Sequence, residues 1–85
     1  MGEKILIVDD IELNREILAV ALGDTYPVLE AGNGNQAIEI LREHSEDIAA
    51  ILLDLIMPKV DGLGVMEKLR EDKTIRKMPL IIVLS

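Results

Sequence analysis

The chain contains no cysteine, tryptophan or phenylalanine, and Tyr26 is its one aromatic residue. Without cysteine it can form neither disulfides nor thiolate metal sites. The shortage of aromatic side chains argues against binding of single-stranded nucleic acids, whose bases stack on such rings. No apolar run reaches the ~18–20 residues of a membrane span, and the N-terminus lacks a signal-peptide pattern. We therefore expect a cytoplasmic protein that makes no membrane contact.

Positive charge is also scarce. The chain has nine lysines and arginines and 16 acidic residues, which gives a formal net charge of −7. Such a chain repels phosphate backbones, so we expect no direct nucleic-acid contact, and any phosphate chemistry needs a cation to mediate it. The length of 85 residues allows one domain, and a hydrophobic content of 49% indicates a globular protein with an aliphatic core.

Short apolar runs alternate along the chain with stretches of helical periodicity. The runs predict strands over 4–8, 26–31, 48–53 and 80–84, and the periodic stretches predict helices over 11–22, 35–44 and 63–70. The predicted order is βαβαβαβ. Strands that alternate with helices in this way indicate an α/β fold with a doubly wound parallel sheet and right-handed crossovers.

Three carboxylates directly follow predicted strands: Asp9 and Asp10 after the first, and Asp54 after the third. Ligands of open α/β folds bind at the carboxyl ends of the strands, so these acids converge if the two strands are neighbours. Asp10 could instead cap the first helix, and any one of these acids could be a turn residue. Two like charges ~4 Å apart repel by about 4 kcal/mol at an effective dielectric of 20, so three acids together require either raised pKa values or a bound cation. An all-oxygen set with open positions suits Mg²⁺.

The same arrangement suggests phosphoryl chemistry. Two acids can bind the metal while the third attacks phosphorus as a nucleophile and becomes an aspartyl-phosphate. A phosphohydrolase with an aspartate nucleophile is a weaker alternative, because no acid/base residue is suitably spaced. A nucleotide-binding Rossmann unit is weaker still, because GxGxxG is absent and the Gly32–Gly34 turn follows the second strand.

Four motifs together resemble the receiver domain of response regulators, the phospho-acceptor module of two-component signalling. They are ILIVDD at 5–10, AGNGNQA at 31–37, LLDLIMP at 52–58 followed by Asp61-Gly62, and PLIIVLS at 79–85. The resemblance implies a flavodoxin-like sheet with strand order 2-1-3-4. It also implies that the chain is a signalling protein and not an enzyme, and that its partner is a histidine kinase or a phosphotransfer protein.

The resemblance further implies a role for five residues. Asp54 is the phospho-acceptor. Asp10 and Asp54 contact Mg²⁺ directly, Asp9 acts largely through water, and the backbone carbonyl of Ile56 completes the protein ligands. The Ser85 hydroxyl donates a hydrogen bond to the phosphoryl group.

The family's fold continues past Ser85 with a helix, a strand and a final helix, and that portion includes a lysine that pairs with the phosphoryl group. We therefore expect residues 1–85 to be a truncated receiver domain. Its fourth strand is then an aliphatic edge, and its first helix carries a stripe wide enough for two contacts. Both features predict a homo-oligomer that forms through the fourth strand or the uncovered helix-and-sheet face. The alternative function is a folding or self-assembly module with impaired phosphorylation.

Overall fold

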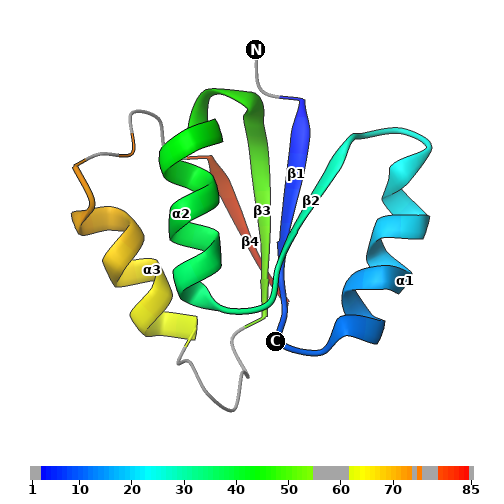
Figure 1. Cartoon of the computed structure of the whole chain (residues 1–85), viewed down its shortest axis with the longest axis horizontal. Helices are drawn as coiled ribbons and strands as arrows, with labels where there is room; N and C mark the ends of the chain where they lie inside the picture. Colours follow the sequence, from blue (N-terminus) through cyan, green and yellow to red (C-terminus); the bar gives the residue numbers. More distant parts are fainter. Residues whose placement is uncertain (1–2, 55–61, 74, 76–78, 85) are drawn as a thin grey trace.

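The computed structural model describes residues 3–54, 62–73, 75 and 79–84. Strands and helices alternate along the chain in the predicted order (Figure 1). The elements are β1 (Lys4–Val8), α1 (Glu12–Gly23), β2 (Val28–Ala31), α2 (Gly34–His44), the 3-10 turn η1 (Ser45–Asp47), β3 (Ile48–Asp54), α3 (Gly62–Glu71) and β4 (Leu80–Leu84). No helix in these ranges is long and apolar enough to cross a bilayer.

The four strands form one parallel sheet in the order β2-β1-β3-β4, which confirms the predicted fold class and topology. β1 occupies an inner position, and Ile7 pairs with Glu30 on one side and Leu52 on the other. At the end of β1, Val8 pairs with Leu53, so β1 and β3 finish side by side. The chain leaves both strands at the lower edge of the sheet in Figure 1.

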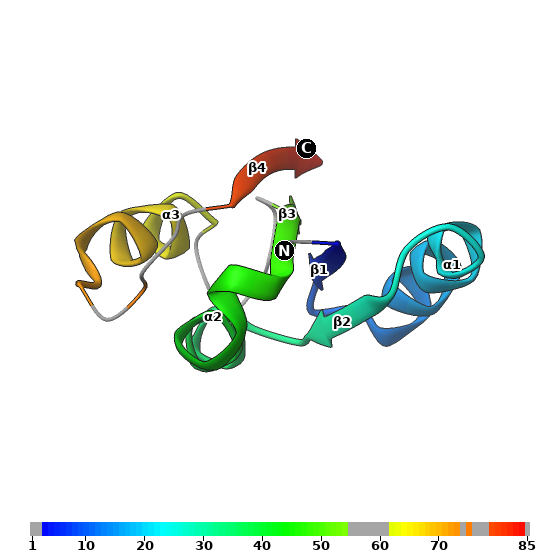
Figure 2. The ribbon, with the colours of Figure 1, turned by 90° about the horizontal axis from the view of Figure 1, so that it is seen from above.

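One face of the sheet carries most of the core. Figure 2 shows α2 and α3 on this side of the strands. Alternate strand residues meet alternate helix residues here because side chains on a strand point to opposite faces in turn. The buried members of this cluster are Leu6, Val8, Ala31, Ala37, Ile38, Leu41, Ile48, Ile51, Leu53 and Leu69.

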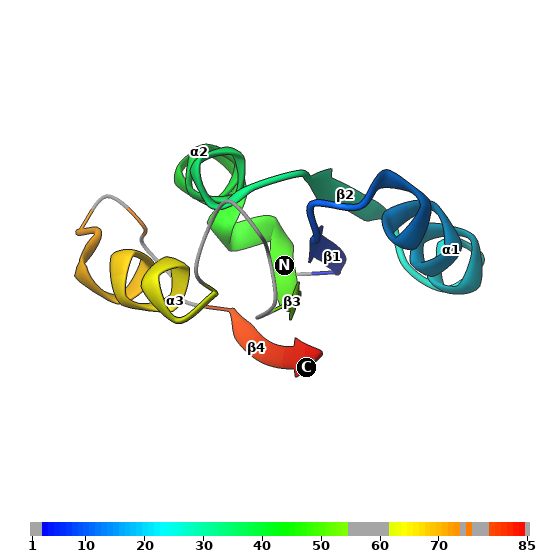
Figure 3. The ribbon, with the colours of Figure 1, turned by 90° about the horizontal axis from the view of Figure 1, so that it is seen from below.

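Among the described elements, α1 alone covers the other face (Figure 3). Its cluster has three buried residues, which are Ile5, Ile7 and Ala50. The side chains of Leu18 and Leu22 on α1 pack against them and remain partly exposed. No residue of α1 is fully buried, so this helix is held by a thinner apolar contact than α2.

Large apolar side chains remain exposed on the α1 face of the protein. On β4, Leu80 pairs with Ala50 and Ile82 with Leu52, so both point to the same face as α1, and they are 67% and 42% exposed. On α1 the exposed set comprises Leu13, Ile17 and Val20. The predicted wide stripe on this helix is therefore divided, and one part packs on the sheet while the other faces solvent.

Candidate functional site

The three predicted acids meet at the edge where β1 and β3 end. Asp9 follows β1 directly, Asp10 begins the turn into α1, and Asp54 is the last residue of β3. The pairing of Val8 with Leu53 places these chain ends next to each other. One carboxylate oxygen from each residue lies within 4.8 Å of the other two. The convergence that the sequence predicted is therefore present.

Asp9 organises the turn between β1 and α1. Its side chain is buried, and its Oδ1 accepts a hydrogen bond of 2.9 Å from the backbone N–H of Ile11. Ile11 is the N-cap position of α1 and makes no side-chain capping bond of its own. Asp9 is therefore the aspartate whose side chain bonds to the backbone of the turn before α1. Asp10 does not cap the helix.

Asp10 has a different environment. Its Oδ1 is buried and has no hydrogen-bond partner among the described residues. A buried carboxylate oxygen without a partner is costly, and the same carboxylate group also lies close to two further acids. A cation removes both costs. Carboxylate oxygens at this spacing form a hard, all-oxygen donor set, which fits Mg²⁺.

Arg15 is a site residue to which the sequence reasoning assigned no role. It lies on α1, and its Nη1 donates a hydrogen bond of 2.6 Å to the backbone carbonyl of Asp9. Its side chain is 17% exposed. The sequence offered one indication of this contact, because Arg15 follows Asp9 by six residues and lies on the next helix. Side chains on a helix point toward its N-terminus, so a long side chain at this position can reach back to the end of the strand.

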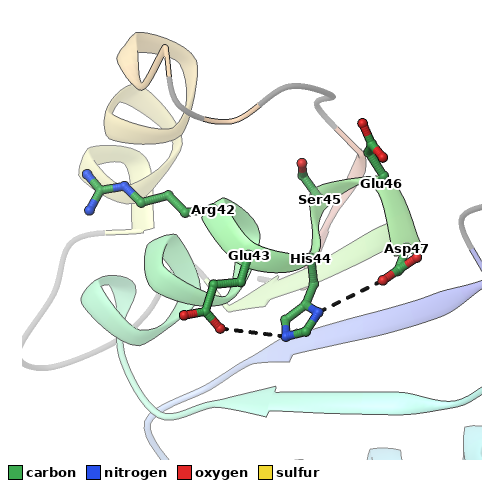
Figure 4. Close-up of a pocket in the computed structure, with 6 residues that line it drawn as sticks. All are labelled: Arg42, Glu43, His44, Ser45, Glu46 and Asp47. Carbon is green, nitrogen blue, oxygen red and sulfur yellow. Dashed lines mark ion pairs between the residues drawn. The ribbon is translucent and has the colours of Figure 1, made fainter.

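Two predicted site groups, the backbone carbonyl of Ile56 and the hydroxyl of Ser85, lie outside the described residues. His44, the one histidine of the chain, is at the opposite edge of the sheet, where α2 ends and β3 is about to begin. Its ring lies 3.7 Å from Glu43 Oε2 and 3.9 Å from Asp47 Oδ2, beside a pocket lined by residues 42–47 (Figure 4). It is therefore remote from the acidic cluster.

The chain is similar to known proteins over its whole length. The model of the response regulator receiver domain matches residues 5–85. The chain belongs to this family. It is 39% identical to response regulator PleD of Caulobacter vibrioides and 40% identical to transcriptional regulatory protein SrrA of Staphylococcus aureus, in each case over 86 aligned positions. These alignments cover 100% of the chain but 18% of PleD and 34% of SrrA.

Solved structures agree with this assignment. The receiver domain of a response regulator from Bermanella marisrubri superimposes with a TM-score of 0.82 at 37% identity. That match covers 100% of this chain and 69% of the Bermanella chain. Receiver domains are signalling modules that interact with histidine kinases or phosphotransfer proteins and bind Mg²⁺ at an acidic pocket. In this receiver domain, Asp9, Asp10 and Asp54 form the acidic group.

Proposed function

We propose that this receiver domain takes a phosphoryl group from a histidine kinase or phosphotransfer protein onto Asp54, with Mg²⁺ bound beside it. The observation that supports this most strongly is the meeting of three carboxylates at the carboxyl edge of the sheet, one of them with a buried oxygen that lacks a partner among the described residues. Such an arrangement is costly without a cation and useful with one.

Each acid has a distinct part in the proposed reaction. A carboxylate oxygen of Asp54 attacks phosphorus, the new O–P bond forms, and the bond from phosphorus to the donor imidazole breaks with its electron pair passing to that nitrogen. Asp10 and Asp54 would bind Mg²⁺, and Asp9, whose Oδ1 already accepts the Ile11 N–H, would contribute mainly through water. When bound, Mg²⁺ neutralises charge on the transferring phosphoryl oxygens.

We further propose that the protein is a stoichiometric acceptor and not a turnover phosphohydrolase, and that it works in the cytoplasm without direct nucleic-acid contact. A hydrolase of this kind needs an acid/base residue close to the nucleophile. The one histidine, His44, lies before the start of β3, whereas Asp54 is the last residue of that strand. His44 and Asp54 are therefore at opposite edges of the sheet.

Intact-mass spectrometry after incubation with acetyl phosphate tests the acceptor proposal. With Mg²⁺ the wild-type chain should gain the mass of one phosphoryl group, and without Mg²⁺ it should gain little. Asp54→Asn should gain none, because an amide is not a competent nucleophile. Asp47→Asn is the matched control, since it removes an exposed carboxylate at the opposite edge, and it should behave as wild type. Phosphorylation of Asp54→Asn, or none of the wild type, contradicts the proposal.

A second proposal concerns self-association, and the exposed apolar side chains on β4 and α1 favour it. Leu80 and Ile82 lie on the sheet face that α1 only partly covers, and β4 is an edge of the described sheet. Aliphatic edges and uncovered faces tend to pair with another chain. We therefore propose a homo-oligomer that forms through this face. If phosphorylation is impaired, such assembly is the alternative function.

Light scattering across a range of concentrations tests this proposal. The wild-type chain should grow in average mass with concentration, and Ile82→Lys should remain closer to a monomer because a charge on the edge opposes pairing. Asn35→Lys adds the same charge at an exposed position of α2, on the other side of the sheet, and should associate as wild type. A folded wild-type monomer at every concentration would refute self-association.

A further inference from the structure

Arg15 connects three parts of the fold next to the acidic cluster. It projects from α1, its Nη1 donates to the Asp9 carbonyl at the end of β1, and its Nε lies 3.4 Å from Glu30 Oε1 on β2. The Nε makes an ion pair at this distance without the geometry of a hydrogen bond. The pairing of Ile7 with Glu30 explains the contact, because Ile7 points to the α1 face and Glu30 does the same.

The turn after β2 leaves room for this guanidinium. A Cβ built on Gly32 would lie 3.4 Å from Arg15 Nη1 and 3.4 Å from Gln36 Oε1, which is van der Waals contact, so this turn lies directly against both groups. Gln36 is itself fixed, because its Oε1 accepts from the Gly32 N–H at 2.7 Å. The guanidinium is thus confined between the turn after β2 and the backbone of Asp9.

We propose that Arg15 is a positioning residue for the metal site, acting through the backbone of Asp9. This inference rests on the proposed binding of Mg²⁺. Asp9 and Asp10 both lie in the short turn between β1 and α1. The backbone N–H of Ile11 donates a hydrogen bond to Asp9 Oδ1, and Arg15 Nη1 donates one to the backbone carbonyl of Asp9. With these two bonds the peptide between Asp9 and Asp10 is fixed, and the Asp10 carboxylate is directed toward Asp54.

The sign of the effect separates positioning from simple electrostatics. Arginine is a cation, so its charge alone repels a metal ion, and its removal should strengthen metal binding. If Arg15 instead fixes the geometry of the acids, its removal should weaken binding despite the lost repulsion. Groups that orient metal ligands typically change affinity by about 10–100-fold when they are mutated. The two explanations therefore predict opposite directions.

Mn²⁺ is a suitable probe, because electron paramagnetic resonance measures the free ion directly during a titration of the 85-residue chain. We expect Arg15→Gln to bind Mn²⁺ about 10-fold more weakly than wild type, with Mg²⁺ competing for the same site. Arg15→Lys keeps the charge but replaces the planar fork with a single ammonium, so it should also bind more weakly. In metal-free protein, the amide proton shift of Ile11 should change in both variants.

Arg42→Gln is the matched control, because it removes an arginine paired with Asp72 at 2.9 Å between α2 and the end of α3. It should bind Mn²⁺ as wild type does while circular dichroism shows folded protein. The inference is overturned if Arg15→Gln binds Mn²⁺ as tightly as wild type or more tightly. It is also overturned if Arg42→Gln weakens Mn²⁺ binding as much as Arg15→Gln does, or if Arg15→Lys binds Mn²⁺ with wild-type affinity. If the wild-type chain binds no Mn²⁺, the proposed metal site itself fails, and that result is distinct from the others.

Discussion

Replacement of Asp10 by asparagine should raise the thermal stability of the metal-free protein. In the presence of Mg²⁺ the same replacement should make the protein less stable than wild type. In the metal-free protein the Asp10 carboxylate is close to two other acids, and its buried Oδ1 has no hydrogen-bond partner among the described residues. Asp10→Asn removes one of three charges and keeps nearly the same shape. It also introduces an N–H₂ group that can donate to a neighbouring carboxylate.

The geometry sets the size of this effect. At 4.8 Å, two unit charges repel by about 3.5 kcal/mol at an effective dielectric of about 20. Asp10 has two such neighbours, so the repulsion at this separation adds to about 7 kcal/mol before solvent screening is considered. Asp10 and Asp54 are both half-buried, and solvent screening reduces the effect to about 1–2 kcal/mol. For a domain of this length, each kcal/mol raises the Tm by about 4–8 °C.

Thermal unfolding followed by circular dichroism measures both halves of the prediction. In EDTA, Asp10→Asn should melt about 4–16 °C above wild type. In Mg²⁺ at about 100 times its Kd, the wild-type chain gains about 2.7 kcal/mol, and the variant, which lacks one ligand charge, gains far less. The order of the two melting temperatures should therefore reverse between the two buffers.

Glu39→Gln is the control for the general effect of lower net charge. Glu39 is exposed on α2, and its replacement removes the same single charge away from the cluster. It should change stability by less than about 0.5 kcal/mol in either buffer. Repulsion within the cluster is ruled out as the cause if Asp10→Asn is no more stable than Glu39→Gln in EDTA. Metal binding by Asp10 is ruled out if Mg²⁺ stabilises Asp10→Asn as much as wild type.

Two further predictions concern the part of the fold that supports the site. Leu41 is fully buried on α2, so Leu41→Ala should lower the free energy of unfolding by about 2–5 kcal/mol in a urea titration. Asn33 caps α2 by accepting the Gln36 N–H at 2.9 Å, so Asn33→Ala should cost about 1 kcal/mol. Asn33→Asp should retain most of that stability, and a loss as large as that of Asn33→Ala would contradict the capping role.

The order of elements could be predicted because it depends on short-range pattern, whereas the meeting of the acids also required the order of the strands in the sheet. Apolar runs bounded by Gly32 and by the acids mark strands, and a parallel sheet brings all carboxyl ends to one edge. Asp9, Asp10 and Asp54 could be placed together because the resemblance to receiver domains supplied the strand order, which makes β1 and β3 neighbours. The bounds of the elements needed little revision, and the largest change was β2, which begins at Val28, two residues later than predicted.

The separate roles of Asp9, Asp10 and Arg15 within the site could not be predicted in the same way. Whether Asp9 or Asp10 bonds the turn depends on side-chain rotamers and on the backbone angle at Ile11, which sequence pattern does not specify. The role of Arg15 depends on the separation between α1 and β2, which is a tertiary property. The roles assigned to Ile56 and Ser85 stay predictions, since both lie outside the described residues.

The thin packing of α1 has a consequence for the order in which the protein opens. Amide hydrogens exchange with solvent fastest where local unfolding exposes little apolar surface, and α1 has no fully buried residue whereas α2 has four. We expect the amides of α1 to exchange well before those of β1, β3 and α2. Because Arg15 lies on α1 and contacts Asp9, opening of this helix also releases the acidic pair. Bound metal should then slow exchange in α1 itself, so that a helix with no metal ligand of its own reports whether the site is filled.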